Sequence, residues 1–114
     1  MTIGLAYAMD TELASLLAQA GERPLETVNG VSFYEIEPDI IACAGGIGKV
    51  NAAMAAQLFL DRYRPDWVLN TGVAGSFRDL PIGTIVVADG VLQHDVDASG
   101  IGGPVGVGST VDPL

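Results

Sequence analysis

Short apolar runs alternate along the chain with longer segments in which apolar residues recur at helical spacing. The first run, residues 2–6, predicts a buried β-strand. The next segment predicts an amphipathic helix, with Asp10 as its N-cap, Gly21 just past its end and Pro24 where a helix cannot continue. Its apolar face consists of Leu13, Leu16, Leu17 and Ala20. The chain therefore begins with a predicted strand, turn and helix.

A β-hairpin is predicted next. Residues 26–28 and 31–36 are separated by Asn29-Gly30. This pair tolerates the two positive φ angles of a type I′ turn, which matches the twist of paired strands. We therefore expect two antiparallel strands joined by a two-residue turn.

The middle of the chain repeats the strand and helix pattern. Residues 40–44 are typical of a buried strand, and residues 49–62 are rich in alanine and leucine and predict a helix. The many apolar residues of this helix lead us to expect that it packs between other elements. Residues 67–69 and 84–88 predict two further strands. Alternating strands and helices indicate an α/β fold with a largely parallel or mixed sheet covered by helices.

The end of the chain differs in character. Residues 98–114 contain five glycines and two prolines without a periodic apolar pattern. We predict a loop or disordered tail here, after a folded region over residues 1–97.

Composition favours a packed, acidic domain. Hydrophobic residues make up 49% of the 114 residues and charged residues only 17%, which argues against disorder. We expect Phe59, Tyr63 and Trp67 to pack in the core or against helices. With 14 acidic and 5 basic side chains, the net charge of −9 repels phosphate backbones and anionic membranes. Neither nucleic acid nor a membrane is therefore an expected partner.

Cys43 is the one cysteine and lies in the apolar run 40–44. It can form no intrachain disulfide and is expected to be a small buried hydrophobe, which fits a reducing compartment. No apolar stretch approaches the ~20 residues that span a bilayer, and no basic region precedes a hydrophobic segment at the start. We therefore expect a cytoplasmic protein.

Three turns of small residues follow predicted strands: Ala8-Met9-Asp10, residues 45–48, and Gly72-Val73-Ala74-Gly75. The second is no Walker A loop, because Val50 stands where serine or threonine is needed. It is no dinucleotide fingerprint either, because Asn51 replaces the third glycine. Open α/β sheets bind ligands beyond the carboxyl ends of their strands, so the three turns predict a pocket floor made of backbone.

Two groups of polar side chains are candidates for chemistry. Glu12 lies in the first turn of the predicted helix, where a carboxylate is ordinarily solvated and favoured by the helix dipole. His94, Asp95 and Asp97 have the spacing of metal ligands, but no nearby residue completes a coordination shell. We therefore expect no metal and no other cofactor.

Four motifs in this order resemble the bacterial 5′-methylthioadenosine/S-adenosylhomocysteine nucleosidases. They are Ile3-Gly4 through Ala8-Met9-Asp10-Thr11-Glu12, Gly46-Ile47-Gly48-Lys49-Val50-Asn51-Ala52-Ala53, Asn70-Thr71-Gly72-Val73-Ala74-Gly75 and Gln93-His94-Asp95-Val96-Asp97. The resemblance covers residues 2 to about 108, the N-terminal half of the family's usual length. It implies the nucleoside phosphorylase fold, a three-layer α/β/α sandwich around a mixed, mostly parallel sheet, here truncated, and assembly as a homodimer.

The resemblance also implies roles for individual residues. Glu12 is similar to a glutamate that activates the attacking water, and substrate burial is expected to raise its pKa. Met9 matches a residue against the ribose, and Ile47 one that lines the alkylthio pocket. Val73 matches a small residue beside the sugar, in a turn that Ala74 and Gly75 complete. The implied reaction is hydrolysis of the N-glycosidic bond of a small-molecule nucleoside, methylthioadenosine or adenosylhomocysteine, to adenine and a thioribose product.

The family's later motifs supply the adenine pocket and the aspartate that protonates the leaving base, and they have no counterpart here. We therefore expect a fragment or a truncated product and assign no activity to the 114 residues alone. Two alternatives stay open: a purine nucleoside phosphorylase of the same fold, and a catalytically inactive binding or oligomerisation fragment. A phosphate site calls for cations, whereas these turns offer little besides Lys49 and Glu12 would repel an anion, so water is the favoured nucleophile.

Overall fold

The computed structural model of the protein describes residues 1–97, 99–103 and 105. The chain divides into two compact units, Met1–Gly75 and Ser76–Leu114. The first unit contains the helices and strands β1 (Ile3–Tyr7), α1 (Asp10–Ala20), β2 (Pro24–Val28), β3 (Val31–Glu37), β4 (Ile40–Ala44), α2 (Lys49–Tyr63) and β5 (Trp67–Asn70). The described part of the second unit contains a short 3-10 helix, η1 (Ser99–Ile101), and an isolated bridge between Asp97 and Val105.

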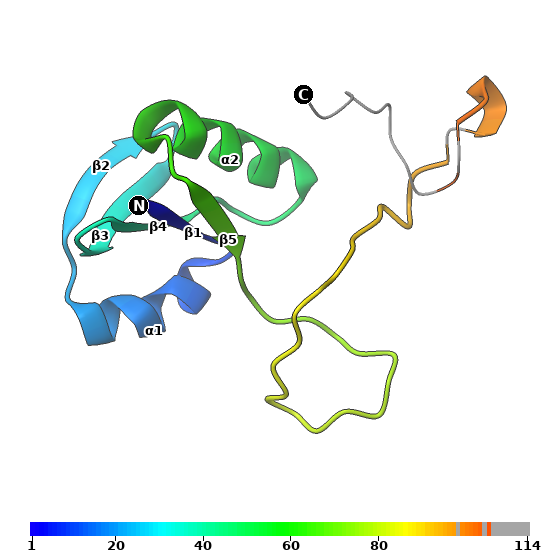
Figure 1. The fold of residues 1–114 in the computed structure, drawn as a ribbon, viewed down its shortest axis with the longest axis horizontal. Coiled ribbons are helices and arrows are strands. Elements are labelled where there is room, and N and C mark those ends of the chain that lie inside the picture. The colour runs from blue at the N-terminus through cyan, green and yellow to red at the C-terminus, as the bar shows by residue number, and fades with distance from the viewer. Residues whose placement is uncertain (98, 104, 106–114) are drawn as a thin grey trace. The chain divides into compact units, whose positions relative to one another are not determined.

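The five strands form one mixed sheet in the order β2-β3-β4-β1-β5 (Figure 1). β1 pairs in parallel with both β4 and β5, whereas β3 pairs antiparallel with β2 and β4. Parallel strands need a crossover connection, and α2 supplies the one from β4 to β5, which lie on either side of β1. The predicted α/β fold with a mixed sheet is confirmed.

The two helices cover opposite faces of this sheet (Figure 1). The core on the α1 side contains Leu13, Leu17, Ile36 and Ala42, and the core on the α2 side contains Val31, Phe33, Cys43, Ala55 and Phe59. Ala42 and Cys43 are consecutive residues of β4, and consecutive side chains of a strand point to opposite faces. Successive side chains of β4 therefore pack into the two cores on opposite faces of the sheet, which gives the three-layer α/β/α arrangement.

Local turn chemistry accounts for the element boundaries. Asn29 and Gly30 have φ angles of 50° and 82°, so the predicted two-residue hairpin turn is confirmed. Gly21, with φ of 82°, ends α1 as predicted. Asp10 is the first residue of α1 and Met9 is the N-cap, so the predicted cap is wrong by one residue. The reason is that the side chain of Glu12 accepts a hydrogen bond from the backbone N–H of Met9, which ties position 9 to the first turn.

α2 packs on the sheet through one face only. Ala55 and Phe59 are its buried residues, whereas Val50 is 84% exposed and Leu60 is 47% exposed. The prediction that this helix packs between other elements is therefore wrong for the described residues. Alanines and isolated larger apolar side chains are tolerated at a protein surface. The number of apolar residues in α2 therefore predicted more burial than the helix has.

The predicted strand over residues 84–88 is absent from the structure. Ile85, Val86 and Val87 are 92%, 68% and 88% exposed, and no described residue pairs with this segment. A strand needs a neighbour to satisfy its backbone groups, so an apolar run alone does not form one.

Trp67 is 64% exposed, so its predicted core position is also wrong. It lies on β5, one of the two edge strands of the sheet. Among the described residues of the first unit, no element covers the outer side of this strand. Phe59 is fully buried and Tyr63 packs against it, which confirms the prediction for these two aromatic residues.

Of the predicted tail at 98–114, the structure describes residues 99–103 and 105, and the other positions lie outside the described residues. Neither α-helix in the described part of the chain is long and apolar enough to cross a bilayer.

Candidate active site

Three backbone turns meet at the carboxyl ends of the adjacent parallel strands β4, β1 and β5. The turn after β4 is bonded to the turn after β1, because the N–H groups of Gly45 and Gly46 donate to the carbonyls of Tyr7 and Ala8 at 2.9 and 3.0 Å. The turn after β5 is joined to β1 through the N–H of Thr71, which donates to the carbonyl of Ala6 at 3.1 Å. The predicted convergence of the turns at one rim of the sheet is therefore observed.

The carboxylate of Glu12 bridges two of these turns. Its Oε2 accepts a hydrogen bond from the N–H of Met9 at 3.0 Å, and its Oε1 accepts one from the N–H of Val73 at 3.1 Å. Met9 belongs to the turn after β1, and Val73 follows β5. The side chain therefore points towards the turns, and both of its oxygens are held by backbone donors.

These donors set the charge state of Glu12. The N–H of Met9, followed by that of Val73, lowers the pKa of this carboxyl below its ordinary value, while desolvation acts in the opposite direction. Hydrogen bonds to a carboxylate favour its charged form. The pKa of Glu12 is therefore lowered here, whereas burial by substrate is expected to raise it. Glu12 is ionised at neutral pH.

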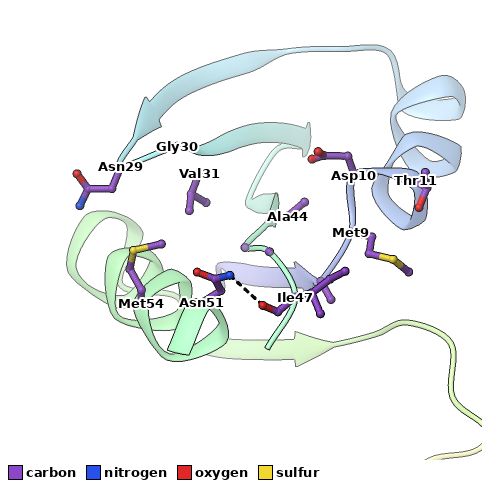
Figure 2. Close-up of a pocket in the computed structure, with 13 residues that line it drawn as sticks. Met9, Asp10, Thr11, Asn29, Gly30, Val31, Ala44, Ile47, Asn51 and Met54 are labelled. Atoms are coloured by element: carbon purple, nitrogen blue, oxygen red, sulfur yellow. Dashed lines mark hydrogen bonds between the residues drawn. The ribbon is translucent and has the colours of Figure 1, made fainter. Parts of the chain in front are cut away.

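An open depression of about 650 Å³ lies beside this rim. It is bounded by the first turn of α1, the hairpin turn at Asn29, and the segment from β4 into α2 (Figure 2). Met9 and Ile47, the two residues that the resemblance assigns to the ribose and the alkylthio group, both line it. The volume falls within the range of about 300–1,000 Å³ usual for small-ligand sites.

Val73, Ala74 and Gly75 do not line this depression. All three are exposed, with 82% of Val73 accessible. The structure thus places them next to Glu12 through the Val73 N–H and separates them from the pocket wall that contains Met9 and Ile47.

Asn51 orders the glycine turn, a role that the sequence analysis missed. Its Nδ2 donates to the carbonyl of Ile47 at 2.8 Å (Figure 2). The same side chain packs on Gly46, whose φ of 95° suits glycine and whose missing Cβ would lie 3.0 Å from Nδ2. An asparagine in the first turn of a helix that follows a glycine loop is the sequence signal for this role.

His94, Asp95 and Asp97 lie in the second unit. The side chain of Ser99, followed by the backbone N–H of Ser99, which donates to Asp97 at 2.9 Å, lowers the pKa of Asp97. Among the described residues, no three side chains of the His, Cys, Asp or Glu type are arranged to hold a metal ion.

Comparison with known proteins identifies relatives along nearly the whole chain. The family model of the phosphorylase superfamily matches residues 2–113. The 5′-methylthioadenosine/S-adenosylhomocysteine nucleosidase of Shewanella loihica is 41% identical over 110 residues, which are 93% of this chain and 48% of that protein. The nucleosidase of the same name from Oceanobacillus iheyensis is 43% identical over 103 residues, which are 87% of this chain and 45% of that protein. The chain spans about half the length of the curated relatives it matches.

Solved structures agree with this result. The 5′-methylthioadenosine/S-adenosylhomocysteine nucleosidase of Colwellia psychrerythraea, solved in complex with adenine, superposes with a TM-score of 0.85 and 36% identity. The match covers 96% of this chain and 47% of that one. The family model and this superposition together show that the chain belongs to the phosphorylase superfamily and is similar to the nucleosidases within it.

Proposed function

We propose that the chain supplies the N-terminal half of a 5′-methylthioadenosine/S-adenosylhomocysteine nucleosidase, which hydrolyses the N-glycosidic bond to release adenine and a thioribose product in purine and methionine salvage. One observation carries the proposal. The Glu12 carboxylate lies where the turns after β1 and β5 meet, with one backbone donor on each oxygen. The names of the relatives, and the adenine in the Colwellia psychrerythraea structure, support this substrate class.

Glu12 is proposed as the base that activates water. Cleavage of an N-glycosidic bond passes through an oxocarbenium-like sugar, so the reaction needs a base for water and an acid for the departing purine. The lowered pKa keeps Glu12 ionised and able to accept a proton. Each oxygen uses one acceptor site on a backbone N–H and keeps another for water. The two backbone bonds thus orient the carboxylate before substrate arrives.

The substrate contacts follow from the same rim. Met9 lies in the pocket wall beside Glu12 and is proposed to contact the ribose. Ile47, 71% exposed at the pocket margin, offers an apolar surface to the alkylthio group. The exposed backbone of Val73, Ala74 and Gly75 is proposed to hold the sugar from the other side of Glu12.

Water is the proposed nucleophile in preference to phosphate. The three turns contain no arginine or lysine, and only Lys49 follows directly on one of them. An ionised Glu12 would repel a phosphate dianion bound beside the turns after β1 and β5. A requirement for phosphate would favour a phosphorylase of the same fold.

We further propose that residues 1–97 belong to the nucleosidase fold, that residues 98–114 form a loop or tail, and that the protein is a cytoplasmic homodimer. Association is supported by the apolar side chains of β5, where Trp67, Val68 and Leu69 are 64%, 39% and 51% exposed. Exposed apolar strands at a sheet edge favour pairing with another chain.

A chimera tests the proposed activity, because the chain spans half of its relatives. In this chimera the chain replaces the matching half of the Shewanella loihica nucleosidase, and adenine release from methylthioadenosine is measured with and without phosphate. We expect phosphate-independent release, and a loss of at least ~10²-fold in Glu12→Gln. The control Glu22→Gln alters an exposed carboxylate just beyond α1 and leaves the rate unchanged.

Three results would contradict this proposal. Near-normal release by the Glu12→Gln chimera would remove Glu12 from the mechanism. Phosphate-dependent release would identify a phosphorylase. A chimera that folds, binds adenine weakly and releases none would identify an inactive binding fragment.

A further inference from the structure

We propose that Gly72 is a positioning residue for Glu12: its missing side chain leaves the space in which the carboxylate lies against the end of β5 and accepts the Val73 N–H. The inference deepens the proposed function and rests on it for its catalytic meaning. Glu12, Gly72 and Val73 all lie in the first unit, Met1–Gly75.

The space beside Gly72 is occupied by the carboxylate itself. A Cβ at position 72 would lie 2.8 Å from Oε1 of Glu12 and 3.3 Å from its Cδ. Both distances are shorter than ordinary van der Waals contact between such atoms. No other side chain approaches this point as closely. A methyl group at position 72 and the observed carboxylate therefore exclude each other.

Backbone conformation does not explain the glycine. Gly72 lies outside the left-handed region, unlike Gly46 and Gly48, whose φ angles are 95° and 97°. Alanine at position 72 is therefore compatible with the backbone. The requirement for glycine comes from the contact with Glu12.

The contact also goes beyond helix capping. A capping interaction needs only the bond between the Glu12 carboxylate and the N–H of Met9, three residues away. The bond to Val73 joins residues 61 positions apart and contributes nothing to the start of α1. It places one carboxylate oxygen at the turn after β5, and Gly72 makes that placement sterically possible.

Gly72→Ala should displace the carboxylate and leave the sheet intact. The obstructing atoms are the end of a flexible, half-buried side chain, and they can rotate away from the exposed Val73 N–H at low cost. Rotation would break the bond from the Val73 N–H and retain the bond from the Met9 N–H. With one donor fewer on the charged form, the pKa of Glu12 should rise.

A pH titration of the 114-residue chain by amide NMR measures this displacement directly. In the native chain we expect the Met9 and Val73 amide signals to titrate together with Glu12. In Gly72→Ala the Val73 signal should lose this response, the Met9 signal should keep it, and the midpoint should move to higher pH. Asp10, the other acid in the first turn of α1, is followed through its own signals so that the two titrations are separated.

Gly75→Ala is the matched control. It lies in the same turn, outside the left-handed region, and its added Cβ would meet no atom within 4 Å. Both amide titrations should persist in this variant. An unchanged Val73 titration in Gly72→Ala, or its loss in Gly75→Ala, would overturn the proposal.

A second measurement covers the case in which Gly72→Ala unfolds the chain. Glu12→Ala removes the obstructing carboxylate, so the double variant Glu12→Ala/Gly72→Ala should be as resistant to urea as Glu12→Ala alone. If Gly72→Ala destabilises the Glu12→Ala chain as much as the native chain, the clash lies elsewhere and the inference is wrong.

In the active chimera, Gly72→Ala should lower kcat by about tenfold, the scale of one charge-assisted hydrogen bond, with KM nearly unchanged. The acid limb of the pH–rate profile should move to higher pH, because Glu12 with a raised pKa becomes protonated at a higher pH. The NMR titration requires no turnover. It can therefore succeed when the proposed hydrolysis is refuted, and fail when the hydrolysis is confirmed.

Discussion

The ring of Phe59 in α2 lies so close to Gly4 in β1 that a Cβ at position 4 would be 2.8 Å from its Cε1 atom. Phe59 cannot move aside easily, because it is fully buried and packs edge-on against Phe33 and Tyr63 at centroid distances of 5.4 and 5.7 Å. Gly4→Ala should therefore destabilise the chain by about 1–3 kcal/mol through overpacking. Urea unfolding measures this change.

Gly90→Ala is the control for that measurement. Its added Cβ would meet no atom within 4 Å and its backbone lies outside the left-handed region, so its stability should stay within about 1 kcal/mol of the native value. Equal stability of Gly4→Ala and Gly90→Ala would contradict the close packing of α2 on β1.

Cys43 should be chemically inert while the chain is folded. Burial raises the pKa of its thiol to about 11, and the residue is fully buried on the α2 side of the sheet. Because the thiolate is the reactive form, the folded chain at pH 8 should react with an aromatic disulfide reagent about 100-fold more slowly than the chain in urea. Comparable rates in the two states would show that the sheet opens readily at β4.

Stability should depend on the ionisation of Glu12. Its folded pKa lies below the ordinary value, so the folded state favours the carboxylate. The resulting stabilisation is complete above the unfolded pKa and is lost as the pH falls through the lower folded pKa. Glu12→Gln should therefore lose stability relative to the native chain at pH 7, and the difference should shrink on acidification.

Denaturant unfolding at a series of pH values checks this prediction, with Glu22→Gln as the exposed control. A difference between native and Glu12→Gln chains that stays constant from neutral to acid pH would argue against the paired backbone bonds.

Self-association should depend on β5 more than on the opposite edge of the sheet. β2 carries Pro24 and an irregularity in its pairing, two features that protect edge strands. β5, with the sequence Trp-Val-Leu-Asn, has no proline or charge. Leu69→Lys should therefore shift the chain towards monomer in sedimentation equilibrium.

Leu60→Lys, at a site of similar exposure on α2, serves as the comparison for that experiment. If it disrupts association as strongly as Leu69→Lys, or if the native chain is monomeric throughout, the β5 edge is not the contact.

Much of the first unit could be predicted from short segments. Asn29-Gly30 determined the hairpin because both residues accept positive φ, and the four motifs led to the correct superfamily. The convergence of the three turns at one rim, where Glu12 lies, also followed, because parallel strands bring their carboxyl ends together. These conclusions depend on neighbouring residues or on a general property of α/β sheets.

The tertiary structure decided the properties that depend on distant residues. Residues 84–88 have a strand-like sequence but form no strand, because none of the described residues pairs with them. Trp67 is exposed because β5 is an edge strand. The Met9 N–H makes the largest contribution to the lowered pKa of Glu12, but the contribution of the Val73 N–H and the close approach of Glu12 to Gly72 join residues about 60 positions apart. Sequence patterns specify which backbone angles and faces a segment prefers, whereas pairing, burial and charge state depend on what the folded chain places opposite it.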